Sequence, residues 1–249
     1  MAPRTRLLSL LLFCNLLVGF SAASSLAETP VALELVLAID TSTSVDSAEY
    51  ALQTQGLASA FRHPGVVRAI ESQGPDGIAV SIVHWSGQGR QRISLGWTLL
   101  KSAADAGRFA DRISASPRLL RGFTDIAGAI RFAGRLIAQN SLAGRRRVID
   151  VSGDGSSNSG RTSAARDDAL AAGITINGLV IHNEEYDLGE LAKINLVDHY
   201  RENVIGGPGA FLMIAKDFDD FRTAIRKKLV REITGPLFSQ DVYQAPAIE

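Results

Sequence analysis

The sequence predicts an α/β fold: a doubly wound, mainly parallel sheet of six strands with one antiparallel edge strand and helices on both faces. Short apolar segments alternate with helical segments along most of the chain, as is typical of parallel sheets covered on both faces. The first apolar segment begins at Val31 and ends abruptly at Asp40, which indicates a buried strand. The turn Gly87-Gln88-Gly89 joins two later strands as an antiparallel hairpin.

Apolar periodicity, capping residues and chain breakers place the individual elements. Strands are expected at 31–39, 78–85, 92–97, 147–152, 174–181 and 211–215. Helices are expected at 47–62, 99–113, 126–140, 162–172, 188–200 and 218–234. The first helix has a capping box of Asp46 and Glu49 and stops before Pro64, while the last is capped by Asp217 and stopped by Gly235. The buried stripe of the last helix is expected to be Phe218, Phe221, Ile225 and Leu229.

Residues 1–27 are predicted to be a signal peptide. They combine two early positive charges, Arg4 and Arg6, with an apolar run and a small-residue cleavage site. Cleavage is expected after Ala27, with Ala23 as the alternative position. The apolar run is short for a membrane span, although an uncleaved anchor is the other interpretation.

The bulk composition is that of an ordinary globular protein, and the predicted signal peptide implies that it is periplasmic or secreted. Hydrophobic residues make up 46% and charged residues 21% of the chain, with a formal net charge of zero. This balance gives no sign of binding to nucleic acid or to anionic membranes. The one cysteine, Cys14, lies in the predicted signal peptide, so the mature chain would need no disulfide. One domain is expected at 31–234 without a membrane span, followed by a loosely ordered tail at 235–249.

Three loops at one edge of the predicted sheet carry oxygen-bearing side chains. Asp40, Ser42 and Ser44 follow the first strand. Thr124 comes just before a helix, and Asp154 just after a later strand. Ligands of open α/β sheets bind at the carboxyl ends of the strands, where these loops lie. Carboxylate and hydroxyl oxygens are hard donors that suit Mg²⁺, Mn²⁺ or Ca²⁺ rather than zinc. The sequence therefore predicts a divalent-metal site.

These loops resemble the motifs of von Willebrand factor A domains. The segments that carry the resemblance are Asp40-x-Ser42-x-Ser44, Gly122-Phe123-Thr124 and Ser152-Gly153-Asp154-Gly155. They are similar to that family's D-x-S-x-S motif, threonine loop and second aspartate loop, in the same order and over about 31–234. Gly153 departs from the pattern, because the family usually has threonine directly before the aspartate. The segment from Tyr200 to Gly209 is typical of a bacterial family of exported A-domain-like proteins.

The resemblance implies a metal-ion-dependent adhesion site. By analogy, Ser42 and Ser44, and sometimes Thr124, would bind Mg²⁺ directly, with Mn²⁺ or Ca²⁺ as alternatives. Asp40 and Asp154 would act largely through water. A free position on the cation would then accept a carboxylate from a protein partner. The expected function is an exported, adhesion-type binding module and not an enzyme.

Two other functions remain open for the same residues. The D-x-S-x-S loop, Thr124 and Asp154 can be simple turn and cap residues, which would leave a scaffold with a degenerate site. Alternatively, two carboxylates and Mg²⁺ could serve a hydrolase acting on phosphate or ester groups. The sequence contains no nucleophile elbow, zinc-protease motif or phosphate-loop motif that would favour catalysis.

Three residues outside the motifs are also candidates for a functional role. Trp85 and His182 end strands at the edge of the candidate site and are candidates for a partner-binding rim. Core packing of Trp85 and a surface position for His182 are the alternatives. Asp150 lies inside an otherwise apolar strand. Since a buried carboxylate needs a partner, it is expected to pair with an arginine or to extend the site.

Overall fold

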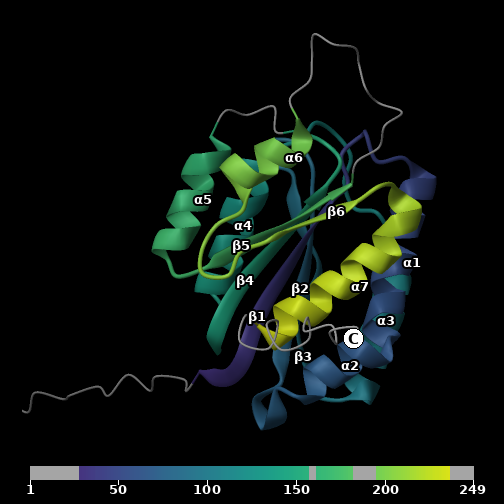
Figure 1. The fold of residues 1–249 in the computed structure, drawn as a ribbon, viewed down its shortest axis with the longest axis vertical. Helices are drawn as coiled ribbons and strands as arrows, with labels where there is room; N and C mark the ends of the chain where they lie inside the picture. The colour runs from purple at the N-terminus through teal and green to yellow at the C-terminus, as the bar shows by residue number, and fades with distance from the viewer. Residues whose placement is uncertain (1–27, 157–160, 182–194, 236–249) are drawn as a thin grey trace, which may run out of the picture.

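The structure, a computed structural model, describes residues 28–156, 161–181 and 195–235. It contains a six-stranded sheet in the order β3-β2-β1-β4-β5-β6 (Figure 1). All neighbouring strands are parallel except β2 and β3, so β3 is an antiparallel edge strand and the predicted fold class is confirmed. The strands are β1 (Thr29–Asp40), β2 (Ile78–Trp85), β3 (Gln91–Leu100), β4 (Leu142–Gly153), β5 (Thr175–Ile181) and β6 (Leu212–Ala215).

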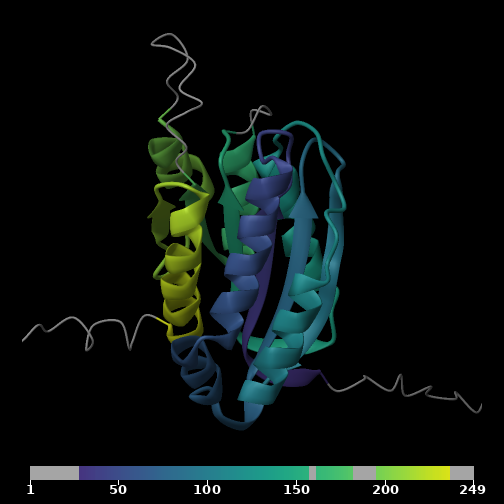
Figure 2. The ribbon, with the colours of Figure 1, turned by 90° about the vertical axis from the view of Figure 1, so that its right-hand side faces the viewer.

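Helices cover both faces of this sheet. They are α1 (Ser47–Arg62), α2 (Pro64–Glu71), α3 (Ala103–Ser114), α4 (Ile126–Ala138), α5 (Thr162–Ala171), α6 (Leu196–His199) and α7 (Phe218–Thr234). Helices α1, α2, α3 and α7 pack on one face, where Figure 2 shows α7, α1 and α3 side by side. Helices α4, α5 and α6 pack on the other face. Among the described residues, no helix is long and apolar enough to cross a membrane.

Strand β1 supplies side chains to the cores on both faces. Leu35 and Leu37 belong to the core beneath α1, α3 and α7, whereas Val36 and Ala38 belong to the core beneath α4 and α5. Successive side chains of a strand point to opposite faces, so a central strand covered on both sides needs apolar residues on both. This explains why β1 is apolar from Val31 to Ile39 except at Glu34. The buried carboxylate of Glu34 accepts hydrogen bonds from the Asn140 side chain and the Gly144 N–H, at 2.6 and 2.8 Å.

The largest differences from the predicted boundaries are at the end of β3, the start of α3 and the start of β4. Strand β3 continues to Leu100, which pairs with the first residue of β2, so α3 begins at Ala103 with Ser102 as its N-cap and not at residue 99. Strand β4 begins at Leu142 and not at residue 147, because its first residues pair with the start of β1. In both cases cross-strand pairing extends a strand beyond its apolar stretch.

Two helices also differ from the prediction. Pro64 follows the end of α1 as expected, but it also begins α2, a helix that the prediction missed. Proline suits the first helical turn because it has no N–H to satisfy, and the Nδ1 of His63 accepts a hydrogen bond from the Gly65 N–H at 3.0 Å. The helix expected at 188–200 lies partly outside the described residues. Its described part is the short α6, followed by a π-helical turn at Tyr200–Val204.

The predicted limits and buried face of α7 are confirmed. The carboxylate of Asp217 accepts a hydrogen bond from the Asp220 N–H at 2.7 Å, and Gly235 ends the helix with a positive φ of 79°. The expected apolar stripe is buried at Phe218, Phe221, Ile225 and Leu229. Helix α7 thereby packs along α1, where a side chain at Gly56 would lie 3.0 Å from the Phe221 ring.

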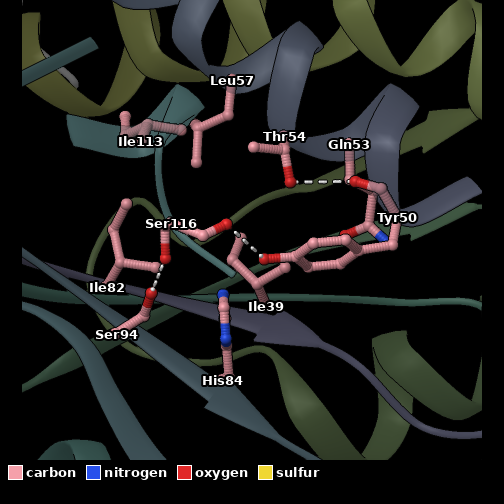
Figure 3. A pocket seen from close by; sticks show the side chains of 10 residues that line it. All are labelled: Ile39, Tyr50, Gln53, Thr54, Leu57, Ile82, His84, Ser94, Ile113 and Ser116. Atoms are coloured by element: carbon pink, nitrogen blue, oxygen red, sulfur yellow. Dashed lines mark hydrogen bonds between the residues drawn. The ribbon is translucent and has the colours of Figure 1, made fainter. Parts of the chain in front are cut away.

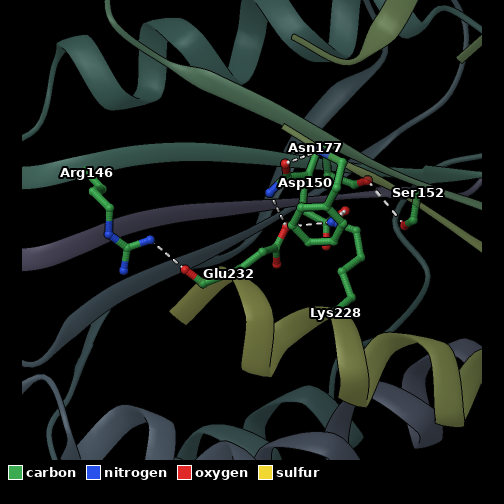
Figure 4. Close-up of polar contacts among 8 residues, drawn as sticks. Arg146, Asp150, Ser152, Asn177, Lys228 and Glu232 are labelled. Atoms are coloured by element: carbon green, nitrogen blue, oxygen red, sulfur yellow. Dashed lines mark hydrogen bonds and ion pairs between the residues drawn. The ribbon is translucent and has the colours of Figure 1, made fainter. Parts of the chain in front are cut away.

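A buried charged cluster fixes α7 to the middle of the sheet (Figure 4). The Nζ of Lys228 lies 3.0 Å from the Oδ1 of Asp150 and also pairs with Glu232 one turn further along the helix. The amide of Asn177 donates to Glu232 at 2.9 Å. Burial and the charge of Glu232 raise the pKa of Asp150 to about 7, against the opposing effect of Lys228. Asp150 therefore has a structural role, but the expectation of an arginine partner was wrong.

Candidate metal-binding site

The three motif loops lie at the same end of the sheet. Asp40 is the last residue of β1, and β4, whose end precedes Asp154, is its parallel neighbour, with Ile39 opposite Ser152. Thr124 lies beside the third loop, because a side chain at Gly155 would sit 3.3 Å from its Oγ1. The tertiary structure thus brings together segments that are more than a hundred residues apart in the chain.

A chain of hydrogen bonds joins the two carboxylates of the site. The Ser42 N–H donates to the Oδ1 of Asp40 at 2.7 Å, and the Oγ atoms of Ser42 and Ser44 are 3.0 Å apart. The Oγ of Ser44 donates to the Oδ1 of Asp154 at 2.7 Å. Four of the five predicted ligands are therefore linked in a single chain of contacts. The hydroxyls and carboxylates face one another, as a shared cation would require.

The electrostatics of the site favour a bound cation. Asp40 is fully buried, and its Oδ2 has no hydrogen-bond partner among the described residues. Burial and the nearby Asp154 raise the pKa of Asp40 to about 8, and burial also raises the pKa of Asp154. A fully buried carboxylate with one orphaned oxygen, beside a second and partly buried carboxylate, is costly unless a positive charge compensates it.

The donor set is that of a hard divalent cation. Within the described ranges no group of three or more His, Cys, Asp or Glu side chains could hold a metal. The candidate site instead combines two carboxylates with three hydroxyls, from Ser42, Ser44 and Thr124. Hydroxyl and carboxylate oxygens suit Mg²⁺ or Mn²⁺, which retain several waters and need few protein ligands. The residues present therefore fit the predicted cation.

Arg118 holds the first loop in place, a role that the sequence did not reveal. Its guanidinium donates to the carbonyls of Thr41 and Ser42 at 2.8 and 2.6 Å, and to the carbonyl of Asp46 at 3.0 Å. It also lies over the ring of Tyr50, 5.7 Å from the centroid. An arginine in a loop after a proline has no distinctive sequence signal, so only the tertiary contacts identify it.

Gly153, the departure from the family pattern, is required by close packing. It is the last residue of β4, and a side chain there would lie 2.8 Å from the Oδ2 of Asp40 and 3.0 Å from the hydroxyl of Tyr200. Tyr200 is itself fully buried, and burial together with the carboxylate of Asp40 raises its pKa well above 10. Because Gly153 has no side chain, the carboxylate of Asp40 and the neutral phenol of Tyr200 can both lie close to the end of β4.

Of the two candidate residues for a partner-binding rim, the structure describes only Trp85. Trp85 is completely buried and packs in the core against α4. The suggestion that it lines a rim is therefore wrong, because a central strand end covered by a helix leaves no surface there. His182 lies outside the described residues.

A small hollow lined by both polar and apolar side chains lies between α1 and the sheet, and it is too small for a ligand (Figure 3). Tyr50 and His84 point into this hollow, whose volume is about 20 Å³. Burial lowers the pKa of His84 to about 4, so the imidazole is neutral at physiological pH. The volume fits about one water molecule. A larger hollow of about 410 Å³ opens at the other end of the sheet, beside the first residues of β4 and β5.

The strand order, the antiparallel edge strand and the helices on both faces are those of the von Willebrand factor A-like fold. The chain belongs to the family described as "Protein of unknown function (DUF1194)", which matches residues 30–237. No curated protein matches the chain in sequence.

Solved structures share the fold at low identity. Proximal thread matrix protein 1 from the mussel byssus superposes with a TM-score of 0.58 at 15% identity, covering 83% of this chain and 49% of its own. The pilus adhesin SpaC from Lactobacillus rhamnosus GG gives 0.58 at 12% identity, covering 82% and 30%. The SpRpn10 VWA domain gives 0.53 at 11% identity, covering 81% and 97%. The chain thus spans about half the length of the mussel protein, and the likeness concerns the fold alone.

Proposed function

We propose that this domain is an exported protein-binding module that captures an acidic group of a partner through a divalent cation. Asp40, Ser42, Ser44, Thr124 and Asp154 would hold the cation, with Mg²⁺ as the expected ion and Mn²⁺ or Ca²⁺ as alternatives. The observation that carries the proposal is the orphaned Oδ2 of the fully buried Asp40, beside a second carboxylate whose pKa is also raised.

The chain's own residues would prepare the site for a partner. The two carboxylates balance the charge of the cation, and the neutral hydroxyls leave it electrophilic. When bound, the cation would supply a centre that accepts an oxygen of an incoming carboxylate. Arg118 holds the first loop through hydrogen bonds to its carbonyls, and Gly153 leaves room for the carboxylate of Asp40. A structure of mussel proximal thread matrix protein 1 is described as having a "zinc occupied MIDAS motif", that is, an occupied metal-ion-dependent adhesion site. A protein that shares this fold thus binds a divalent cation, which supports the proposal.

Titration of the metal-free chain without residues 1–27 tests this proposal. Isothermal titration calorimetry should show one bound Mg²⁺ or Mn²⁺ per chain, with a dissociation constant on the order of 10⁻⁴ M. Replacing Asp154 with alanine should weaken binding at least about 10-fold, because one of two carboxylates is lost. The exposed Asp111 on α3 provides a matched control, and Asp111→Ala should bind like the parent. Absence of binding by the parent to Mg²⁺, Mn²⁺, Ca²⁺ and Zn²⁺ at millimolar concentration would refute the proposal.

Adding a methyl group at Gly153 should disturb the site without removing a ligand. In Gly153→Ala the new Cβ would lie 2.8 Å from the Oδ2 of Asp40, so the carboxylate must shift. We expect Mg²⁺ affinity to fall roughly 10-fold, as for other groups that position ligands. Gly134 on α4 has open space around it, and Gly134→Ala should leave the affinity unchanged in the same calorimetric experiment. Equal affinities for both variants would show that Gly153 does not position Asp40.

A further inference from the structure

An unusually exposed aromatic side chain lies next to the candidate metal site. Phe123 is 80% exposed, whereas the other large apolar side chains on the described surface are between 38% and 45% exposed. It directly precedes Thr124, one of the candidate ligands. Exposing a phenyl ring to water is unfavourable, and neither core cluster includes this ring. Its position therefore contributes nothing to the packing of the domain.

The backbone that carries Phe123 is held on both sides. The carbonyl of Gly122 accepts hydrogen bonds from the N–H and the Oγ1 of Thr43, at 2.8 and 3.1 Å. Gly122 has a φ of 141°, a conformation that L side chains rarely adopt. On the other side, the Asp125 N–H donates to the carbonyl of Ser86 at 3.0 Å. Phe123 thus projects from a fixed loop, so that little ordering would be needed when a partner covers it.

Two exposed arginines lie beside the loop that carries Phe123. Arg90 and Arg121 are exposed, and the Nη1 of Arg90 donates to the carbonyl of Arg121 at 3.3 Å. The Nη2 of Arg121 donates to the Oγ of Ser47 at 3.1 Å, which places it over the start of α1. Basic side chains at a rim attract acidic partners and favour their encounter. An acidic segment with an apolar residue is thus complementary to both the charge and the exposed ring.

We propose that Phe123 is a specificity-determining residue that packs against an apolar side chain which the partner carries beside its metal-binding carboxylate. The recognised segment is then an aspartate or glutamate with an apolar neighbour. This inference rests on the proposed function, since it requires the cation to fix the carboxylate. Aromatic side chains at the centre of interfaces commonly supply a large share of the binding energy, and the metal contact alone would not distinguish one acidic segment from another.

A peptide library tests this inference without knowledge of the natural partner. The library is displayed on phage, with one fixed aspartate flanked by randomised positions, and is selected on the signal-free chain in Mg²⁺. Selection on the parent should enrich apolar residues within two positions of the aspartate. Selection on Phe123→Ser should lose this preference, and the peptides from the parent should bind the variant about 10-fold more weakly. Mg²⁺ affinity should be the same in both proteins.

Leu99→Ser is the matched control for Phe123→Ser. Leu99 is also exposed but pairs with Ala79 at the opposite end of the sheet, so Leu99→Ser should select the same peptides as the parent. If parent and Phe123→Ser enrich aspartate peptides in a Mg²⁺-dependent manner but with the same flanking residues, the role of Phe123 is refuted and the proposed function stands. If neither protein selects Mg²⁺-dependent peptides although both bind Mg²⁺, carboxylate capture itself is refuted as well.

Discussion

Replacing Lys228 with methionine should lower the free energy of unfolding by roughly 3–5 kcal/mol, as in other proteins in which one member of a buried ion pair is removed. Lys228, Asp150 and Glu232 are all at most 2% exposed. Without the ammonium group, two carboxylates would share a buried space in which Asn177 donates to Glu232 and Arg146 is the remaining cation that interacts with Glu232. Urea unfolding at pH 7, followed by circular dichroism, measures the change.

Two further variants separate charge from packing at Lys228. The neighbouring Lys227 is exposed, and Lys227→Met should change the free energy of unfolding by no more than about 0.5 kcal/mol. The triple variant Lys228→Met, Asp150→Asn, Glu232→Gln removes all three charges together. It should recover most of the lost stability, because a charge-free replacement of a buried ion cluster is often neutral. A triple variant no more stable than Lys228→Met would show that packing, and not charge, determines the effect.

The metal-free protein should lose stability as the pH rises from about 4 to about 8. The pKa of Asp40 is raised from 3.8 to about 8 in the folded chain, so over this range the unfolded carboxyl has lost its proton while the folded one keeps it. The folded state then binds more protons, and the free energy of unfolding falls with rising pH. At pH 7 the loss is at most about 4 kcal/mol, from three pH units at about 1.4 kcal/mol each.

The variant Asp40→Asn should remove the loss of stability that Asp40 causes at high pH, and it should also abolish stabilisation by metal. Asparagine keeps an oxygen that can accept the Ser42 N–H but carries no charge. In a chelator at pH 7, Asp40→Asn should therefore unfold at higher urea concentration than the parent, with a smaller dependence on pH. The slope should persist in part, since the pKa of Asp154 is raised too. Excess Mg²⁺ should stabilise the parent by mass action but not the variant.

An exposed carboxylate again provides the comparison for these pH measurements. Asp111 has a side chain that is 73% exposed, and Asp111→Asn should follow the parent at every pH. Thermal unfolding in chelator at pH 5 and pH 8 is sufficient for the test. A metal-free parent that is equally stable at both values would contradict the assignment of Asp40 as an uncompensated buried carboxylate.

Much of the fold was predictable because its signals are local. The apolar run of β1, interrupted only by Glu34, indicates burial on both faces, and the capping residues Asp46 and Asp217 start α1 and α7 where expected. Local patterns were insufficient where pairing between distant segments extends an element, as at the start of β4. They were also insufficient at Pro64, because a proline that stops one helix is equally suited to begin the next.

For the candidate site, the sequence by itself determined the residue types and their places at strand ends. Asp40 and Asp154 follow strands whose carboxyl ends must share an edge in a parallel sheet, so their proximity follows from fold class. Only the tertiary structure decided what surrounds them. Three sets of contacts join residues that are far apart in the chain. They are the hydrogen bonds of Arg118 to the first loop, the approach of Tyr200 to Gly153, and the pairing of Asp150 with Lys228. Such contacts depend on how whole elements pack and on which buried charges must compensate one another, and no periodicity or local motif encodes either.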